Sequence, residues 1–335
     1  MDIQKNIPLA PYTTVKIGGP ADFFTHIKNS SEFLEAIKYG KDNNLPITIL
    51  GNGSNVLISD SGIRGLVIKN DSNNFSILDT PVESQKLDKI STHRTEENPT
   101  KYLNFGALDY DESDKPRVLV KIDSGCLLSQ SINQLIDQGI TGLQWFGYIP
   151  GTIGGAVYSN IHGGAYHFSD FIESVEVFDL QDKSIKNLKK SEIIWDYDSS
   201  SFQQNSNLII ISVTLSLFKG DTVRAKETVA AWIKQKSYVQ LMNSIGSVFK
   251  NPSLEVCLPI WGEQKSTGWI IDNELHLKEY AIGDAQISPL HANFIINNGH
   301  ATASDYLKLI KYIQVQALEK LNLTLEPEIK FLGQF

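Results

Sequence analysis

Two short apolar segments near the start of the chain are separated by a glycine loop, Gly51–Asn55, with the sequence Gly-Asn-Gly-Ser-Asn. The flanking segments, Ile47–Leu50 and Val56–Ser59, have the length and the branched side chains of strands. Because glycine permits positive φ and close backbone approach, such a loop suits N–H groups that converge on a phosphate. Taken alone, a tight turn is the more common structure for such a loop.

The glycine loop matches neither of two common phosphate-binding motifs. A dinucleotide-binding fingerprint requires a third glycine where this chain has Val56, and a helix instead of the predicted strand. A P-loop requires Gly-Lys followed by serine or threonine, a combination that the chain lacks. The first part of the chain is therefore predicted to be neither a Rossmann domain nor a P-loop domain.

A second glycine-rich segment, Ile149–Ala156, has the sequence Ile-Pro-Gly-Thr-Ile-Gly-Gly-Ala. Its three glycines stand between apolar residues, which suits backbone packed against a flat ring system. The same pattern suits the start of a helix that is crowded against a sheet. The sequence of this segment alone leaves the two interpretations open.

Helical and strand periodicities alternate along the chain and predict a mixed α/β (α+β) fold. The longest predicted helix, residues 303–321, begins with a capping-box pair, Thr302 and Asp305, and has an apolar stripe. The composition divides the chain into residues 1–70, a polar insertion at 71–117, residues 118–220 and residues 221–335. Further helices are predicted at 31–39, 127–138 (closed by Gly139) and 222–236, and further strands at 65–69, 118–123 and within 171–218.

The composition argues against several classes of protein. The net charge is −8 and no block of Lys and Arg alternates with aromatic residues, so a nucleic-acid partner is not expected. Two cysteines, Cys126 and Cys257, are too few for a disulfide framework, and the histidines lack metal-ligand spacing, so no metal is expected. No signal-peptide pattern or membrane-spanning apolar stretch is visible, which predicts a cytoplasmic protein without a membrane partner.

Two segments carry groups suited to catalysis. Residues Gly246–Pro252 place a hydroxyl (Ser247), a cation (Lys250) and an amide (Asn251) close together, without the Gly-x-Ser-x-Gly pattern of acyl transfer. Glu328 follows a proline at the start of an apolar segment, where desolvation can raise the pKa of a carboxyl group, as an acid catalyst requires. The simpler alternatives are a serine in an ordinary turn and a solvated glutamate.

Taken together and in order, seven segments resemble the UDP-N-acetylenolpyruvoylglucosamine reductase family, also called UDP-N-acetylmuramate dehydrogenases or MurB proteins. The resemblance covers nearly the whole chain except residues 71–117, and the fixed order of the segments makes it specific. The matching segments are Thr13–Ala21, Leu50–Leu57, Gly142–Ala156, Gly246–Pro252, Gly268–Asp272, His291–Asn297 and Leu325–Glu328.

The resemblance implies two FAD-binding subdomains of the PCMH type, residues 1–70 and 118–220. A C-terminal α+β substrate-binding domain, residues 221–335, follows, and its last strand returns towards the flavin. Ser247 and Glu328 match the family's catalytic serine and glutamate. The residues that match its FAD-binding motifs are Gly51, Asn52, Gly53, Ser54, Asn55, Ile149, Pro150, Gly151, Thr152, Gly154, Gly155 and Ala156. The residues expected at the substrate are Asn251, Lys250, Lys236, Tyr197 and His291.

The implied activity is the NADPH-dependent reduction of UDP-N-acetylglucosamine enolpyruvate to UDP-N-acetylmuramate, a step of peptidoglycan precursor synthesis. NADPH would reduce the bound FAD, and a hydride would then add to the enolpyruvyl double bond while negative charge develops beside the substrate carboxylate. Ser247 would deliver the completing proton, and Glu328 would be the protonated or hydrogen-bonding partner of the enolate. The UDP-sugar is the expected small-molecule partner, and the protein is expected to be a monomer.

One position departs from the family pattern Tyr-Arg-x-Ser-x-Phe, because the chain has Asp198 in place of the arginine. A carboxylate would repel a carboxylate substrate, so either Asp198 turns away or another cation replaces the guanidinium. The candidate cations are Lys236, Lys250 and His162. A family lysine matches Lys234 and Lys236 equally well. The departure leaves two alternatives to an active reductase: a catalytically impaired flavin-binding paralogue, or a flavin dehydrogenase that acts on another substrate.

Overall fold

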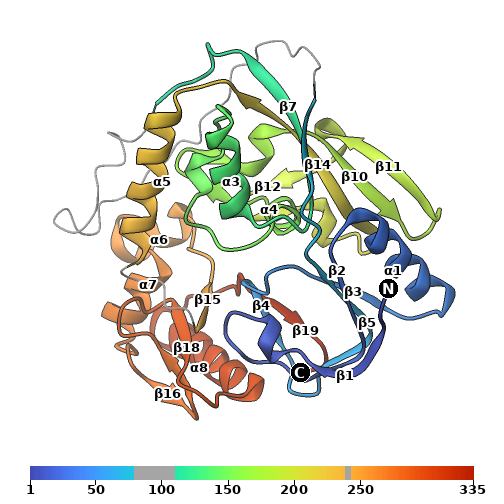
Figure 1. Ribbon diagram of the computed structural model, residues 1–335. Helices are drawn as coiled ribbons and strands as arrows, with labels where there is room; N and C mark the ends of the chain where they lie inside the picture. Colours follow the sequence, from blue (N-terminus) through green and yellow to red (C-terminus); the bar gives the residue numbers. More distant parts are fainter. Residues whose placement is uncertain (79–109, 238–242) are drawn as a thin grey trace.

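The computed structural model describes residues 1–78, 110–237 and 243–335. Most of the predicted insertion, residues 79–109, lies outside the described residues, as do residues 238–242. The described chain forms three lobes, each built around its own sheet (Figure 1). The mixed α/β class predicted from the sequence is confirmed.

The first lobe is a four-stranded sheet with one helix packed on it. Its elements are β1 (Gln4–Pro8), β2 (Pro20–Ile27), α1 (Ser30–Asp42), β3 (Ile47–Leu50), β4 (Val56–Ile58) and β5 (Ile63–Asn70). The strand order is β1-β2-β5-β3, with β2, β5 and β3 parallel. Helix α1 supplies the crossover that parallel strands require, and Asn29 caps it by accepting the Glu32 N–H at 2.9 Å.

The second lobe is a five-stranded antiparallel sheet covered by three helices. Its main elements are β6 (Phe75–Leu78), β7 (Arg117–Asp123), α3 (Leu128–Asp137), α4 (Ile153–Ser159), β10 (Ile172–Asp179), β11 (Ser184–Lys189), β14 (Leu208–Phe218) and α5 (Thr222–Ser237). The strand order is β11-β10-β14-β7-β6. Two short hairpins, β8 (His162–Gly163) with β9 (Tyr166–His167) and β12 (Trp195–Asp196) with β13 (Ser199–Ser200), extend from this lobe. As predicted, Gly139 closes α3 with a φ of +80°.

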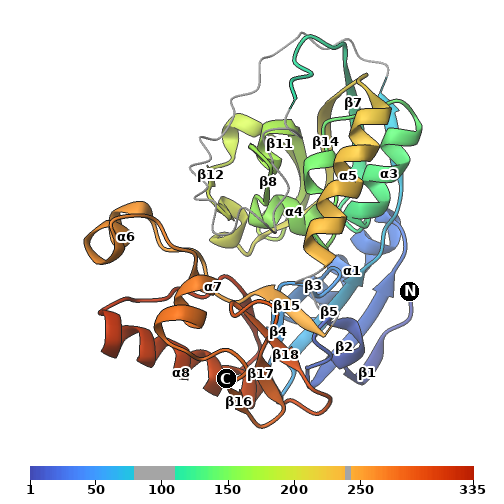
Figure 2. The same cartoon turned by 90° about the vertical axis from the view of Figure 1, so that its left-hand side faces the viewer.

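The third lobe combines a four-stranded antiparallel sheet with the longest helix. Its elements are β15 (Ser244–Ser247), α6 (Leu254–Trp261), α7 (Thr267–Trp269), β16 (Ala281–Ile282), β17 (Ala285–Ile287), β18 (Phe294–Asn297) and α8 (Ala303–Leu321). The strand order is β15-β18-β17-β16. The predicted capping box is present, because Thr302 accepts the Asp305 N–H and Asp305 accepts the Thr302 N–H. Figure 2 shows α6 standing away from the rest of this lobe.

Contacts between distant segments hold the lobes together. The last strand, β19 (Lys330–Leu332), pairs in parallel with β4 of the first lobe, and the two lie side by side in Figure 1. Asp60, two residues after β4, accepts the N–H groups of Ala303 and Ser304 at 2.7 and 2.9 Å and so caps α8. Helix α1 shares its buried cluster with Phe178 and Ile211 of the second sheet.

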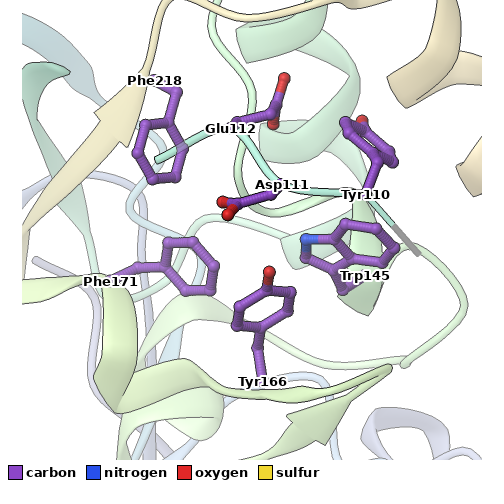
Figure 3. Close-up of a pocket in the computed structure, with 7 residues that line it drawn as sticks. All are labelled: Tyr110, Asp111, Glu112, Trp145, Tyr166, Phe171 and Phe218. Carbon is purple, nitrogen blue, oxygen red and sulfur yellow. The ribbon is translucent and has the colours of Figure 1, made fainter. Parts of the chain in front are cut away.

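The end of the predicted polar insertion, residues 110–117, folds into the second lobe. Glu112 is only 7% exposed and accepts hydrogen bonds from the Thr141 hydroxyl at 2.9 Å and the Gln144 amide at 3.1 Å. Figure 3 shows the neighbouring Asp111 carboxylate pointing into a small aromatic-lined cavity. The aromatic residues that line this cavity are Tyr110, Trp145, Tyr166, Phe171 and Phe218.

Among the described residues, none of the helices has the length and apolar character that a bilayer crossing would require. Within the same residues, no group of three or more His, Cys, Asp or Glu side chains is placed to hold a metal ion.

Candidate active site

The two glycine-rich segments predicted to act together face each other in the structure. The Ser54 hydroxyl donates to the Pro150 carbonyl oxygen at 3.0 Å. A Cβ atom added at Gly51 would lie 2.9 Å from the Thr152 hydroxyl oxygen. The loop at 51–55 from the first lobe and the segment at 149–156 from the second therefore form one surface.

The loop at 51–55 is packed closely against the segment at Tyr12, and only glycine fits at its centre. Gly53 has a φ of +64°, and a Cβ there would lie 2.2 Å from the Tyr12 carbonyl oxygen. Within the described part of the chain, the backbone N–H groups of Asn52, Gly53 and Ser54 donate to no protein acceptor. Consecutive free donors on a glycine loop suit an anionic group such as a pyrophosphate.

The segment at 149–156 is the start of a helix, so the helix interpretation of its glycines is confirmed. The Thr152 hydroxyl caps α4 by accepting the Gly155 N–H at 3.2 Å. Gly154 is crowded against the chain that enters α3, since its N–H donates to the Ser124 carbonyl oxygen at 2.8 Å. Gly155 is exposed, and a Cβ there would meet nothing closer than 3.5 Å. The bare backbone of this turn leaves room for a flat ligand beside it.

A cavity of about 360 Å³ lies where the three lobes meet. Its described lining residues come from the first lobe (Thr14, Ser54), the second lobe (Gly147, Tyr148, Pro150), helix α5 (Ile233, Lys236, Ser237) and strand β15 (Ser244, Ile245). Thr14 joins two of these walls, because its hydroxyl lies 3.3 Å from the Gly53 carbonyl oxygen and 2.8 Å from that of Ser244. The cavity is large enough for part of a nucleotide cofactor or substrate.

Lys234 and Lys236, which match the family lysine equally well in the sequence, take different positions on helix α5. Lys236 lines the cavity, and its Nζ atom lies 5.1 Å from the centroid of the Tyr148 ring. Lys234 is exposed and does not line the cavity. The structure therefore places Lys236, and not Lys234, on the wall of the cavity.

The backbone segments that carry Ser247 and Glu328 are paired although they are far apart in the sequence. Ser247 ends β15, and the preceding Gly246 has a φ of +86° with open space where a Cβ would stand. The Glu328 N–H donates to the Val248 carbonyl oxygen at 2.8 Å, so Glu328 lies beside the residue that follows Ser247. The next hydrogen bond along this pair joins the Lys250 N–H to the Glu326 carbonyl oxygen at 2.9 Å.

The surroundings of Glu328 favour its protonated form. Burial, followed by the negative charge of Asp198, raises the pKa of Glu328 to about 8. Lys250 and Lys330 lower the pKa of the same carboxyl group and only partly offset these effects. Glu328 is therefore mostly a neutral carboxylic acid at neutral pH, able to donate a hydrogen bond or a proton.

Asp198 pairs with His162 and is not among the described residues that line the cavity. It lies in the loop between β12 and β13, and its carboxylate oxygen is 2.8 Å from the Nδ1 atom of His162. Of the three candidate cations from the sequence, His162 pairs with Asp198 itself. The positive charge of Lys250 lowers the pKa of Glu328. The positive charge of Lys236 lowers the pKa of His291, and the Lys236 Nζ lies over the Tyr148 ring.

Lys330 is a cation near Glu328 that the sequence analysis missed. It stands two residues after Glu328, and its Nζ donates to the Gln203 side-chain oxygen at 2.7 Å. The Lys330 backbone N–H donates to the Asn55 carbonyl oxygen at 3.0 Å, which ties this residue to the glycine loop. Its position two residues after Glu328 in the sequence could have pointed to it.

Three other residues predicted to bind the substrate, Asn251, Tyr197 and His291, are not among the described residues that line the cavity. The Asn251 side-chain oxygen accepts the Thr267 N–H at 2.9 Å, so this amide holds the start of α7. Tyr197 is 47% exposed and stacks on His162 with ring centroids 4.8 Å apart. Burial, followed by the charge of Lys236, lowers the pKa of His291 to about 4, which keeps its ring neutral.

The sequence and the fold are similar throughout to proteins of one family. Residues 235–332 match the family model for the C-terminal domain of UDP-N-acetylenolpyruvoylglucosamine reductase. The protein of that name from Prochlorococcus marinus subsp. pastoris is 33% identical over 334 residues, which cover 98% of this chain and 97% of the relative. The one from Lactobacillus delbrueckii subsp. bulgaricus is 34% identical, over 100% of this chain and 96% of the relative.

The crystal structure of the UDP-N-acetylenolpyruvylglucosamine reductase (MurB) of Thermus caldophilus has the same fold, with a TM-score of 0.71 and 28% identity. The match covers 99% of this chain and 100% of that one. The molecule is therefore an oxidoreductase of mixed α/β fold, in which three lobes enclose a common cavity. Its similarity along the full length assigns it further: the chain belongs to the UDP-N-acetylenolpyruvoylglucosamine reductase family.

Proposed function

We propose that this protein reduces UDP-N-acetylglucosamine enolpyruvate to UDP-N-acetylmuramate with electrons from NADPH, using bound FAD. The reaction saturates the enolpyruvyl double bond and supplies a precursor of peptidoglycan. Identity of 33–34% over the full length to reductases of this name supports the assignment.

The main observation in support of the proposal is that four segments distant in the sequence meet beside one cavity. Residues 51–55, 149–156, 244–250 and 326–330 are linked by direct hydrogen bonds, and the first three border or line the same cavity. The residues fit FAD because the free N–H groups at 52–54 suit its pyrophosphate and the bare glycine turn suits its ring. When bound, FAD supplies the hydride that the double bond requires and that NADPH provides.

The chain's own residues then supply protons, charge and orientation. Ser247, beside the open face at Gly246, donates the proton that completes the product. Glu328, protonated at neutral pH, donates a hydrogen bond to the carboxylate on which negative charge develops. Lys236 presents a positive charge at the cavity wall, where it can pair with a phosphate or carboxylate of either substrate.

Two finer predictions from the sequence remain part of this proposal: the protein is cytoplasmic, and it acts as a monomer. Fractionation of cells that express the tagged protein tests its location. Sedimentation equilibrium of the purified protein tests its oligomeric state.

An anaerobic single-turnover experiment tests the reaction in two halves. NADPH should bleach the visible absorbance of the purified yellow protein, and the enolpyruvyl sugar nucleotide should then restore it. The product should be UDP-N-acetylmuramate by mass spectrometry. UDP-N-acetylglucosamine, which lacks the double bond, is the matched control and should leave the flavin reduced.

The same experiment separates the alternatives. A protein that is bleached by NADPH but not reoxidised by the enolpyruvyl substrate would be an impaired paralogue or a dehydrogenase of another substrate. A colourless protein that does not take up flavin would contradict the proposal as a whole.

A further inference from the structure

The cavity where the three lobes meet has one flat aromatic wall. Among the lining residues that the structure describes, Tyr148 is the only aromatic residue and Lys236 is the only charged one. Pro150, Ile233 and Ile245 add apolar surface, and the other lining side chains end in hydroxyl groups. The described wall therefore offers a ligand a ring face, apolar surface and one positive charge.

The Tyr148 ring is held in place by buried packing. It stacks on the Trp232 ring, with centroids 4.9 Å apart and an angle of 25° between the planes. Trp232 is only 1% exposed, whereas Tyr148 lines the cavity. The preceding Gly147 is crowded as well, because a Cβ there would lie 3.0 Å from both methyl carbons of Val229. The ring is thus in place before a ligand arrives, which lowers the entropy cost of binding.

Lys236 brings a positive charge to the same ring. It stands one helical turn after Trp232 on α5, so one helix both supports the ring and supplies the charge. The Lys236 Nζ lies 5.1 Å from the centroid of the Tyr148 ring, a distance at which cation–π attraction keeps the ammonium group at this wall. A ring that stacks on Tyr148 would have an attached phosphate within reach of that ammonium group.

The lining connects Tyr148 to both parts of the proposed reaction centre. Pro150, two residues after Tyr148, accepts the hydroxyl of Ser54 in the glycine loop at 3.0 Å. Strand β15, which ends at Ser247, contributes two residues to the same lining. A ligand at Tyr148 would therefore border the surface that suits FAD and the strand that carries Ser247.

We propose that Tyr148 is a ring-stacking residue for an exchangeable nucleotide, and that Lys236 binds the phosphate attached to that ring. This inference rests on the proposed function, in which NADPH and the UDP-sugar are the nucleotides that enter and leave. Both carry planar rings joined through ribose to phosphate, so the wall suits the chemistry that they share. FAD is not the expected occupant, because the free N–H groups at 52–54 and the glycine turn at 149–156 already suit it.

The test measures binding without turnover, in the protein with FAD bound. NADP⁺ and UDP-N-acetylglucosamine are titrated into the oxidised protein by calorimetry, since neither reacts with oxidised flavin. Tyr148→Leu removes the ring and should raise the Kd of one or both nucleotides about tenfold or more. Tyr148→Phe keeps the ring, and its Kd values should stay within about twofold of the wild-type values. Tyr148→Met is measured as well, so that a folding defect in one variant does not decide the result.

The chain offers a matched control and a second variant at the wall. Tyr280 also stacks on an aromatic ring, with centroids 4.7 Å apart from Tyr312, and is not among the described lining residues, so Tyr280→Leu should leave both Kd values unchanged. Lys236→Met should weaken binding of the same nucleotide as Tyr148→Leu. The loss in the double variant should be smaller than the product of the two single losses, because the Tyr148 ring holds the Lys236 ammonium group.

A loss for either nucleotide in Tyr148→Leu, with near wild-type binding in Tyr148→Phe and unchanged flavin content, supports the proposal and identifies the nucleotide. Unchanged binding of both nucleotides in the folded leucine and methionine variants overturns it, as does an equal loss in Tyr148→Phe or a loss of flavin in place of a loss of nucleotide. A wild-type protein that binds neither nucleotide would contradict the proposed function as well, so the two failures are distinguishable.

Discussion

Glu328 gives the strongest quantitative prediction, because its pKa places its protonation change within an accessible range. With a pKa of about 8, the acid form makes up about 90% of the protein near pH 7 and about 10% near pH 9. If the acid form is required, the rate of substrate reduction should fall about tenfold over this interval. Because the pKa of this carboxyl group is raised, the rate should be highest at lower pH and should decrease as the pH rises through 8.

The assay is anaerobic stopped-flow, in which reduced enzyme is mixed with saturating enolpyruvyl substrate at a series of pH values. Glu328→Gln keeps a neutral hydrogen-bond donor at every pH, so its slower rate should lack the alkaline decline. His291 cannot produce that decline, because its pKa is lowered to about 4. A flat wild-type profile, or the same decline in Glu328→Gln, would refute the assignment of the acid.

Three other substitutions test the site and the fold. Ser247→Ala should retain flavin reduction by NADPH but slow the second half-reaction about 100-fold or more in stopped-flow traces, and equal losses in both halves would contradict its role as proton donor. Gly53→Ala should lower the flavin content of the purified protein. It should also lower the free energy of unfolding by at least about 2 kcal/mol, because the new Cβ would stand 2.2 Å from the Tyr12 carbonyl oxygen. The control Gly139→Ala, which has open space for a Cβ, should lower the free energy of unfolding by about 1 kcal/mol. Glu112→Ala should lower the free energy of unfolding by about 1–3 kcal/mol in a urea titration by leaving buried donors unpaired, whereas the exposed Glu227→Ala should change it little.

Features that depend on neighbouring residues could be predicted from the sequence. The capping box at Thr302 and Asp305 and the glycine that closes α3 act within one turn of their helices, so their residue types suffice to identify them. The strands on either side of the 51–55 loop were likewise visible from their apolar side chains.

Features that depend on distant contacts could not be derived from local patterns. The pairing of Glu328 with Val248 joins segments from different parts of the chain, and only the family resemblance suggested that they meet. The burial of Glu112 likewise depends on donors from Thr141 and Gln144, which no local sequence pattern connects to it. The hydrogen bond between the Lys330 Nζ and the Gln203 side-chain oxygen is also a long-range contact that no local sequence pattern predicts.

The pairing of β19 with β4 has a consequence for the order in which the molecule assembles. The sheet edge beside the 51–55 loop is completed by residues that the ribosome adds long after the loop itself. The second lobe, whose strands are mostly joined by nearby segments, can mature earlier during translation. The loop at 51–55, whose Asn55 carbonyl oxygen accepts the Lys330 N–H, therefore reaches its final hydrogen bonding only after residues 330–332 have been synthesised.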